Sequence, residues 1–282
     1  MRDRPPRRLR PTGRARAGRG ERLSVRGVIL DLDGTVCLGD ALLPGARQAV
    51  EFLRRKGLPW LFLSNTLDHP QVFAERLTRL GLPTSPAEIV NAPMAVLRYL
   101  DRHAPGARLF VIGLPPLAEQ LAVAHRLTDD PQEVDAVVVS VDYEFDYRKL
   151  EIAFQALRRG ARFLATNLDR TWPTPDGEVP DTGAMLGAIE ACTRRKVDAV
   201  VGKPSAWMAE LALQRLGSPA DRTWVVGDSL ESDVQLGRQA GMTTALVLTG
   251  VTHPEDLDRA AVRPDFVLDS LGDLPALLDA EL

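Results

Sequence analysis

The sequence predicts an α/β protein, a doubly wound parallel sheet into which a second, smaller α/β domain is inserted. Three observations predict this fold. Short apolar runs alternate with segments of helical periodicity. Three of these runs end in polar residues, as LDLD, LSN and VVGD. Between the second of these runs and the third lies a segment of about 100 residues, 83–182, that has strands and helices of its own and is long enough for a domain. Strand–helix alternation of this kind is typical of a Rossmann-like sheet.

The core is expected to be discontinuous and to cover residues 23–82 and 183–282. RGVILDLD predicts a strand, and GARQAVEFLRRKG predicts a helix that ends at Gly57. LPWLFLSN predicts the next strand, and a second helix is expected to begin near Asp68 and to end at Gly81. RTWVVGD, MTTALVLTG and DFVLDS predict the later strands, with a helix in SDVQLGRQAG.

Residues 83–182 are the expected inserted domain. RLFVIG, VDAVVVSVD and ARFLATN predict its strands, and LRYLDRH and KLEIAFQALRRG its clearest helices. RTWPTPDGE is expected to be a loop of this domain.

Residues 1–22 differ from the rest of the chain in charge. They hold nine Arg against one Asp and one Glu, whereas the whole chain has a net charge of -3. Because they carry almost no large apolar side chains, we expect them to be disordered. Two interpretations stay open: a weak tether to an anionic surface or nucleic acid, and a solvated extension without function, which we favour.

Composition excludes several classes of protein. With 45% hydrophobic and 26% charged residues, and no apolar run near the roughly 18 residues of a membrane span, the chain predicts a soluble protein without a membrane partner. Cys37 and Cys192 form neither a disulfide framework nor a zinc site, so we expect a cytoplasmic protein. The first residues lack the apolar segment of a secretory signal. A homodimer remains open.

Polar residues gather where the predicted strands end, and they are Asp31, Asp33, Ser64, Asn65, Lys203, Asp228 and Asp233. Asp31 and Asp33 are two positions apart on an extended segment and are expected to point the same way, so a cation would relieve their repulsion. Together with Asp228 they form a hard oxygen set that suits Mg²⁺. One Asp can attack phosphorus while a second carboxyl group transfers protons. Ser64 and Lys203 suit a phosphate.

Each of these signals is weak by itself. DxDG also opens a calcium loop, but Val36 and Leu42 stand where that loop needs Gly and Glu. GKPS is not a Walker loop, because Pro204 replaces its Ser or Thr. The Asp pair could merely cap a turn. The joint occurrence of these signals at the ends of separate predicted strands favours the catalytic interpretation.

The motifs DLDGT (31–35), SN (64–65), GKP (202–204) and GDSLESD (227–233) resemble, in this order, the four motifs of the haloacid dehalogenase superfamily of phosphatases. Segments between the motifs resemble the p-nitrophenylphosphatase-like subfamily, which includes UMP, pyridoxal phosphate, phosphoglycolate and glycerol-phosphate phosphatases. The resemblance covers roughly residues 24–282. It implies that the core is a phosphatase core and that the inserted domain is a cap which selects the substrate.

The resemblance also implies a role for each motif residue. Asp31 would be the nucleophile and Asp33 the general acid/base. Mg²⁺ would be held by Asp31, the backbone carbonyl of Asp33, and Asp228. Asp233 would orient the motif lysine or a metal-bound water.

The phosphate would be held by Ser64, by the backbone around Asn65 and Thr66, and by Lys203. His69 lies where the family usually has small residues; a first-turn position in the helix is favoured over a contact with substrate.

In the cap, Asn167, Asp169 and the loop RTWPTPDGE are the candidates for substrate specificity. Trp172 could stack on a planar substrate group, although packing between cap and core is favoured. Asp181 stands where family members often have Gly.

The favoured function is a Mg²⁺-dependent phosphatase acting through an aspartyl-phosphate. Its partner would be a small phosphorylated metabolite: a nucleotide, a sugar or glycerol phosphate, phosphoglycolate or pyridoxal phosphate. A phosphotransferase or mutase is disfavoured by the resemblance, since mutases of that superfamily generally carry a small helical cap soon after the first motif. Here only about thirty residues separate DLDGT from SN, enough for one helix and a strand. A non-catalytic binding protein on the same fold is disfavoured because both motif aspartates are present.

Overall fold

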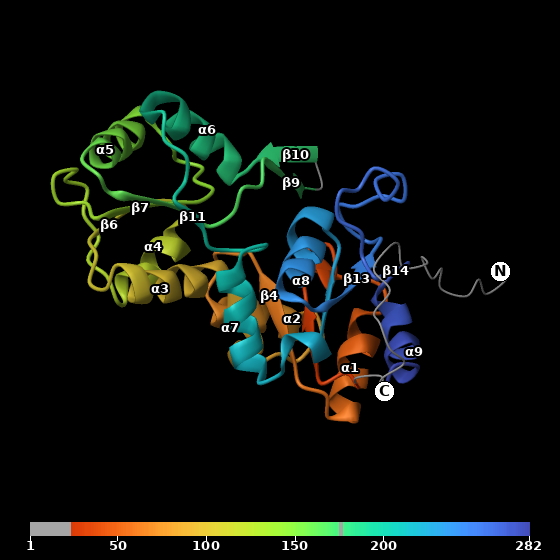
Figure 1. Ribbon diagram of the computed structural model, residues 1–282. Helices are drawn as coiled ribbons and strands as arrows, with labels where there is room; N and C mark the ends of the chain where they lie inside the picture. The colour runs from red at the N-terminus through yellow and green to blue at the C-terminus, as the bar shows by residue number, and fades with distance from the viewer. Residues whose placement is uncertain (1–23, 175–176) are drawn as a thin grey trace. The chain divides into compact units, whose positions relative to one another are not determined.

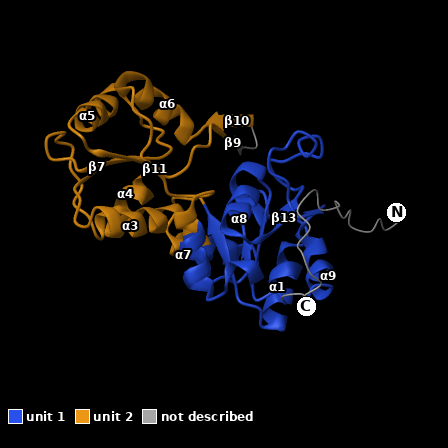
Figure 2. Ribbon diagram, in the orientation of Figure 1, with its two compact units in different colours: residues 1–64, 74–90, 209–282 blue, residues 65–73, 91–208 orange. Residues whose placement is uncertain are grey.

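The structure is a computed structural model that describes residues 24–174 and 177–282 (Figure 1). The expected disorder of residues 1–22 lies outside the described residues. The chain divides into two compact units (Figure 2). Among the described residues, unit 1 holds 24–64, Ala74–Val90 and Ala209–Leu282, and unit 2 holds Asn65–Phe73 and Asn91–Met208.

Unit 1 is built on a six-stranded sheet with the strand order β14-β13-β12-β1-β4-β5. The strands are β1 (Gly27–Leu30), β4 (Trp60–Ser64), β5 (Ile89–Asn91), β12 (Thr223–Gly227), β13 (Thr243–Val247) and β14 (Phe266–Leu268). β1 pairs in parallel with both β12 and β4, and β13 pairs in parallel with both β12 and β14. The predicted parallel α/β core is therefore confirmed.

Helices flank this sheet: α1 (Ala46–Lys56), α2 (Pro70–Arg79), α7 (Ala206–Leu216), α8 (Gln235–Ala240) and α9 (Leu274–Asp279). The first residues of α2 and of α7 belong to unit 2. α1 shows why the sequence folds this way, because Ala46, Val50 and Leu53 recur at helical spacing and are fully buried. It ends where predicted, at Gly57, which adopts φ 62° and donates its N–H to the last turn. The short elements are β2 (Cys37–Leu38), β3 (Ala41–Leu42), η1 (Pro86–Glu88), η2 (Ala220–Arg222), η3 (Leu230–Val234) and η4 (Leu271–Asp273).

Unit 2 has a sheet of its own, with the order β11-β8-β7-β6 and parallel pairing throughout. Its strands are β6 (Leu109–Ile112), β7 (Ala136–Val139), β8 (Arg162–Ala165) and β11 (Ala199–Val200). Its helices are α3 (Ala92–His103), α4 (Pro115–Ala122), α5 (Tyr147–Arg158) and α6 (Thr182–Thr193). Strands β7 and β8 and helices α5 and α6 supply one shared apolar core.

Three details differ from the expectations. The expected core segment begins at 183, but Leu186 and Ile189 of α6 are buried in the core of unit 2. β11 pairs with β8 of unit 2, so the GKP motif does not follow a strand of the six-stranded sheet. The segment expected as a loop is a hairpin of β9 (Thr171–Thr174) and β10 (Gly177–Pro180). In the part of the chain that the structure describes, no helix has the length and apolar character needed to cross a membrane.

Candidate active site

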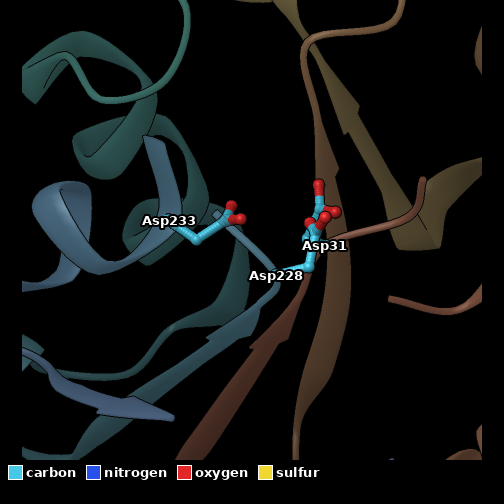
Figure 3. Close-up of side chains that lie close together, drawn as sticks. All are labelled: Asp31, Asp228 and Asp233. Carbon is cyan, nitrogen blue, oxygen red and sulfur yellow. The ribbon is translucent and has the colours of Figure 1, made fainter. Parts of the chain in front are cut away.

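Three buried carboxylates form a cluster in unit 1 (Figure 3). Asp31, Asp228 and Asp233 are 6%, 4% and 2% exposed, and each offers one carboxylate oxygen within 4.8 Å of the others. Asp31 directly follows β1 and Asp228 directly follows β12. Because β1 and β12 are adjacent parallel strands, their carboxyl ends meet at one edge of the sheet, the edge where ligands bind in such folds.

The chain turns sharply after Asp31. The N–H of Asp31 donates to the carbonyl of Val226 at 2.8 Å, which continues the sheet ladder one residue beyond β1. Gly34 then adopts φ 83°, and a Cβ at this position would overlap the carboxylate of Asp228. Asp33 lies in this turn and is exposed, whereas Asp31 is buried. The two aspartates therefore occupy different environments.

Asp228 is held by the segment that follows β13. Its Oδ2 accepts from the N–H of Val251 at 2.7 Å, and its Oδ1 accepts from Thr35 Oγ1 at 3.4 Å. Thr249 Oγ1 donates to the carbonyl of Gly34 at 2.7 Å, which ties this segment to the turn after Asp31. Gly250 lies so close to Asp228 that any side chain there would displace the carboxylate. The segment 249–251 therefore fixes one side of the cluster.

Asp233 lies in η3 and supplies the third carboxylate of the cluster. Its Oδ2 accepts from the N–H of Ser229 at 3.2 Å. The sequence predicted a role for Asp233 in orienting other groups, and the structure brings its carboxylate among the three. Three buried like charges repel one another unless a cation or a proton intervenes, and an all-carboxylate donor set suits a hard divalent ion. The residues present therefore fit a metal such as Mg²⁺.

The other predicted site residues divide between the two units. Ser64 ends β4 of unit 1, next to β1, and is 3% exposed. Asn65, Thr66 and Lys203 belong to unit 2. The expectation that Lys203 lies at the edge of the same sheet as Asp31 is wrong, because the strand before it, β11, pairs with β8 of unit 2. β11 has only two residues, so its partner could not be predicted from the sequence.

In unit 2 the side chain of Asn65 contacts the backbone of Lys203. Its Oδ1 accepts from the Lys203 N–H at 2.8 Å, and its Nδ2 donates to the Lys203 carbonyl at 3.3 Å. Lys203 itself is 4% exposed. Thr66 Oγ1 accepts from the N–H of Asp68 at 3.3 Å. Sequence reasoning assigned Asn65 and Thr66 to the phosphate but did not foresee the contact with Lys203.

Two buried amides that sequence reasoning missed hold the segment after Thr66. Asn91 Nδ2 donates to the carbonyl of Asp68 at 2.8 Å, and Gln120 Nε2 donates to the carbonyl of Leu67 at 2.6 Å. Asn91 also donates to Gln120 Oε1 at 2.9 Å. Asn91 ends β5 and caps α3, whereas Gln120 lies in α4, and no local sequence pattern pairs one residue with the other.

The remaining candidates lie in unit 2. His69 Nε2 is 3.4 Å from Glu119 Oε2, and its side chain is 39% exposed. Asn167 is buried, and its Oδ1 accepts from the N–H of Asp169 at 3.0 Å. Trp172 is 41% exposed on β9.

Burial raises the pKa of two groups already named from the sequence, Cys37 and Asp181. Burial, reinforced by the carboxylate of Asp33, raises the pKa of the Cys37 thiol to about 12. Burial also raises the pKa of Asp181, the N-cap of α6, although its Oδ1 accepts from the N–H of Thr182 at 2.6 Å.

Comparison with known proteins agrees with this geometry. Residues 28–125 match the family described as haloacid dehalogenase-like hydrolase, and residues 200–274 match a second model described as HAD-hydrolase-like. The chain is 38% identical to the sugar-phosphatase AraL of Bacillus subtilis, across 91% of this chain and 94% of that protein. It is 31% identical to the acid sugar phosphatase of Staphylococcus aureus, across 89% and 97%.

Solved structures give the same result. The 4-nitrophenylphosphatase of Thermotoga maritima has a TM-score of 0.86 and 35% identity, covering 91% of this chain and 99% of that one. The p-nitrophenyl phosphatase of Archaeoglobus fulgidus has a TM-score of 0.84 and 35% identity, covering 90% and 99%. The chain therefore belongs to the haloacid dehalogenase-like hydrolases, and within them to the subfamily of p-nitrophenylphosphatase-like enzymes, which hydrolyse phosphoric monoesters.

Proposed function

We propose that this protein is a Mg²⁺-dependent phosphatase that hydrolyses a small phosphorylated metabolite through an aspartyl-phosphate. The observation that carries the proposal is the buried cluster of Asp31, Asp228 and Asp233 at the carboxyl edge of the parallel sheet. The reaction would take place in the cytoplasm, as the cysteine content suggests.

In the proposed reaction, a carboxylate oxygen of Asp31 attacks the phosphorus, and the bond to the leaving oxygen breaks. Asp33, exposed in the adjoining turn, donates a proton to that oxygen and later accepts one from the water that attacks the aspartyl-phosphate. Asp31, Asp228 and the backbone carbonyl of Asp33 would hold Mg²⁺, with Asp233 beside them. The metal would neutralise negative charge at the phosphate.

Phosphate binding is assigned to Ser64, to the backbone of Asn65 and Thr66, and to Lys203. The ammonium group of Lys203 would balance charge on the phosphate oxygens. Unit 2, which contains most of the inserted segment 83–182, would act as the cap, with Asn167, Asp169 and His69 as candidates for contact with the leaving group.

Sugar phosphates are the substrate class we favour among the monoesters. The support is that two relatives, at 38% and 31% identity over nearly their whole length, are named sugar phosphatases. Nucleotides, glycerol phosphate, phosphoglycolate and pyridoxal phosphate are the comparison substrates. A panel of these esters, compared by kcat/KM, tests the assignment; a preference for a nucleotide over every sugar phosphate would reject it.

The alternatives lead to different observations. A phosphotransferase or mutase would pass the phosphoryl group to a second metabolite, so product phosphate would not accumulate without an acceptor. A non-catalytic binding protein would release no phosphate at all.

The variant Asp31→Asn tests the chemistry. We expect hydrolysis of p-nitrophenyl phosphate to fall at least about 10³-fold with the fold intact, since the variant lacks the nucleophile. Chelation of divalent ions should abolish wild-type turnover, and Mg²⁺ should restore it. Full activity in the variant, or turnover that survives chelation, would reject the mechanism.

A further inference from the structure

One side-chain amide spans both backbone polar groups of Lys203. Asn65 Oδ1 accepts from the Lys203 N–H at 2.8 Å, and Asn65 Nδ2 donates to the Lys203 carbonyl at 3.3 Å. A single hydrogen bond would let the backbone swing about it, whereas two bonds to one residue fix its orientation. We infer that the Asn65 side chain is a positioning residue for Lys203 and does not itself bind the phosphate. The inference rests on the proposed function, in which Lys203 binds the phosphate.

The backbone before Lys203 is held by residues at the end of β8. The N–H of Gly202 donates to the carbonyl of Thr166 at 2.8 Å, and that of Val201 donates to Ala165 at 2.9 Å, so pairing with β8 continues past the end of β11. A Cβ on Gly202 would lie 2.6 Å from Asn65 Oδ1 and would overlap the Thr166 carbonyl. Gly202 therefore fits between the end of β8 and the Asn65 amide, and only a residue without a side chain can do so.

The backbone after Lys203 is also tied down, because the N–H of Ser205 donates to the carbonyl of Gly202 at 2.8 Å. A lysine ammonium is a point charge on a flexible four-carbon chain, so its placement depends on where the backbone starts that chain. Lys203 is 4% exposed, which leaves its side chain little freedom to compensate for a shifted backbone. A displacement of about 1 Å at a reacting group can cost about 100-fold in rate. Loss of the Asn65 amide should therefore act through Lys203.

A double-mutant cycle separates this role from direct binding. The proteins are wild type, Asn65→Ala, Lys203→Ala and the double variant, with Mg²⁺ and p-nitrophenyl phosphate. We expect Asn65→Ala to lower kcat/KM about 10- to 100-fold. We expect the double variant to match Lys203→Ala within about twofold, because the amide has nothing left to position. The inhibition constant of inorganic phosphate should show the same non-additive pattern.

The matched control is Thr193→Ala. Thr193 also lies in unit 2, and its Oγ1 likewise donates to one backbone carbonyl, of Ile189, and accepts from one backbone N–H, of Arg195. Its loss should lower the melting temperature without changing kcat/KM. If Asn65→Ala fails to fold, Asn65→Gln keeps both polar groups but carries them one methylene too far, and the same cycle applies.

The outcomes are distinct. Losses that multiply in the double variant would mean that Asn65 acts on substrate by itself and would overturn the inference. Wild-type activity in Asn65→Ala would also overturn it, while leaving the proposed function intact if Lys203→Ala is impaired. Wild-type activity in Lys203→Ala would instead remove the assigned role of Lys203 from the proposed function.

Discussion

Gly250 sets the position of a carboxylate that the proposed metal site needs. In Gly250→Ala the new Cβ would lie 1.8 Å from Asp228 Oδ2. Ordinary contact begins at 3.4 Å, so the carboxylate must retreat by the difference, about 1.6 Å. That movement also breaks the 2.7 Å hydrogen bond from the Val251 N–H, and a hydrogen bond to a charged group contributes about 1.5–3 kcal/mol.

We therefore expect Gly250→Ala to lower kcat/KM for p-nitrophenyl phosphate at least about 100-fold and to raise the Mg²⁺ concentration for half-maximal activity about 10- to 100-fold. A magnesium titration of initial rates measures both effects. The control is Gly187→Ala, because a Cβ on Gly187 of α6 meets nothing within 4 Å and alanine favours the helix. If Gly250→Ala, folded by circular dichroism, keeps activity and metal response within about twofold of wild type, Asp228 is not held as described.

Three further changes have defined outcomes. Burial raises the pKa of Asp181 in the folded protein, so its contribution to stability falls as the pH rises above 3.8, the ordinary pKa of the group. Asp181→Asn should therefore melt at a higher temperature than wild type at pH 7, and the difference should shrink toward pH 3.8. Equal melting temperatures at pH 7 would contradict this. With a pKa of about 12, the thiol of Cys37 should resist iodoacetamide at mildly alkaline pH while the exposed Cys192 reacts. Peptide mass spectrometry measures the labelling of each thiol, and equal labelling would contradict the burial of Cys37. Removing residues 1–22 should leave kcat/KM unchanged, and a large loss would assign that segment a catalytic role.

The strands of the six-stranded sheet could be predicted because each has a clear local signal. β1, β4, β12 and β13 are apolar runs that end in polar residues or in glycine, so their order along the chain and their alternation with helices identify a parallel sheet. Motif residues at their ends, such as Asp31 and Asp228, follow from the same pattern. Two members of the carboxylate cluster are thus readable from the strand pattern. Asp33, which its spacing grouped with them, is exposed and is not one of the three clustered carboxylates, and Asp233 takes the third place.

What the sequence could not predict depends on long-range pairing. β11 has two residues, and nothing in AV specifies that it pairs with β8. The strands of the hairpin 171–180 contain Pro173 and Pro180, and proline in a run argues against a strand. The contact between Asn65 and Lys203 joins residues 138 positions apart, and neither has a local pattern that points to the other.

The most direct test is to locate the phosphoryl group during turnover. Wild-type enzyme with Mg²⁺ is mixed with excess substrate, quenched in acid within the first turnovers, digested and examined by mass spectrometry. We expect one added phosphoryl group on the peptide that contains Asp31, absent from Asp31→Asn and lost when the substrate is exhausted. A phosphoryl group on Ser64, or burst release of phosphate with no label on Asp31, would contradict the aspartyl-phosphate mechanism.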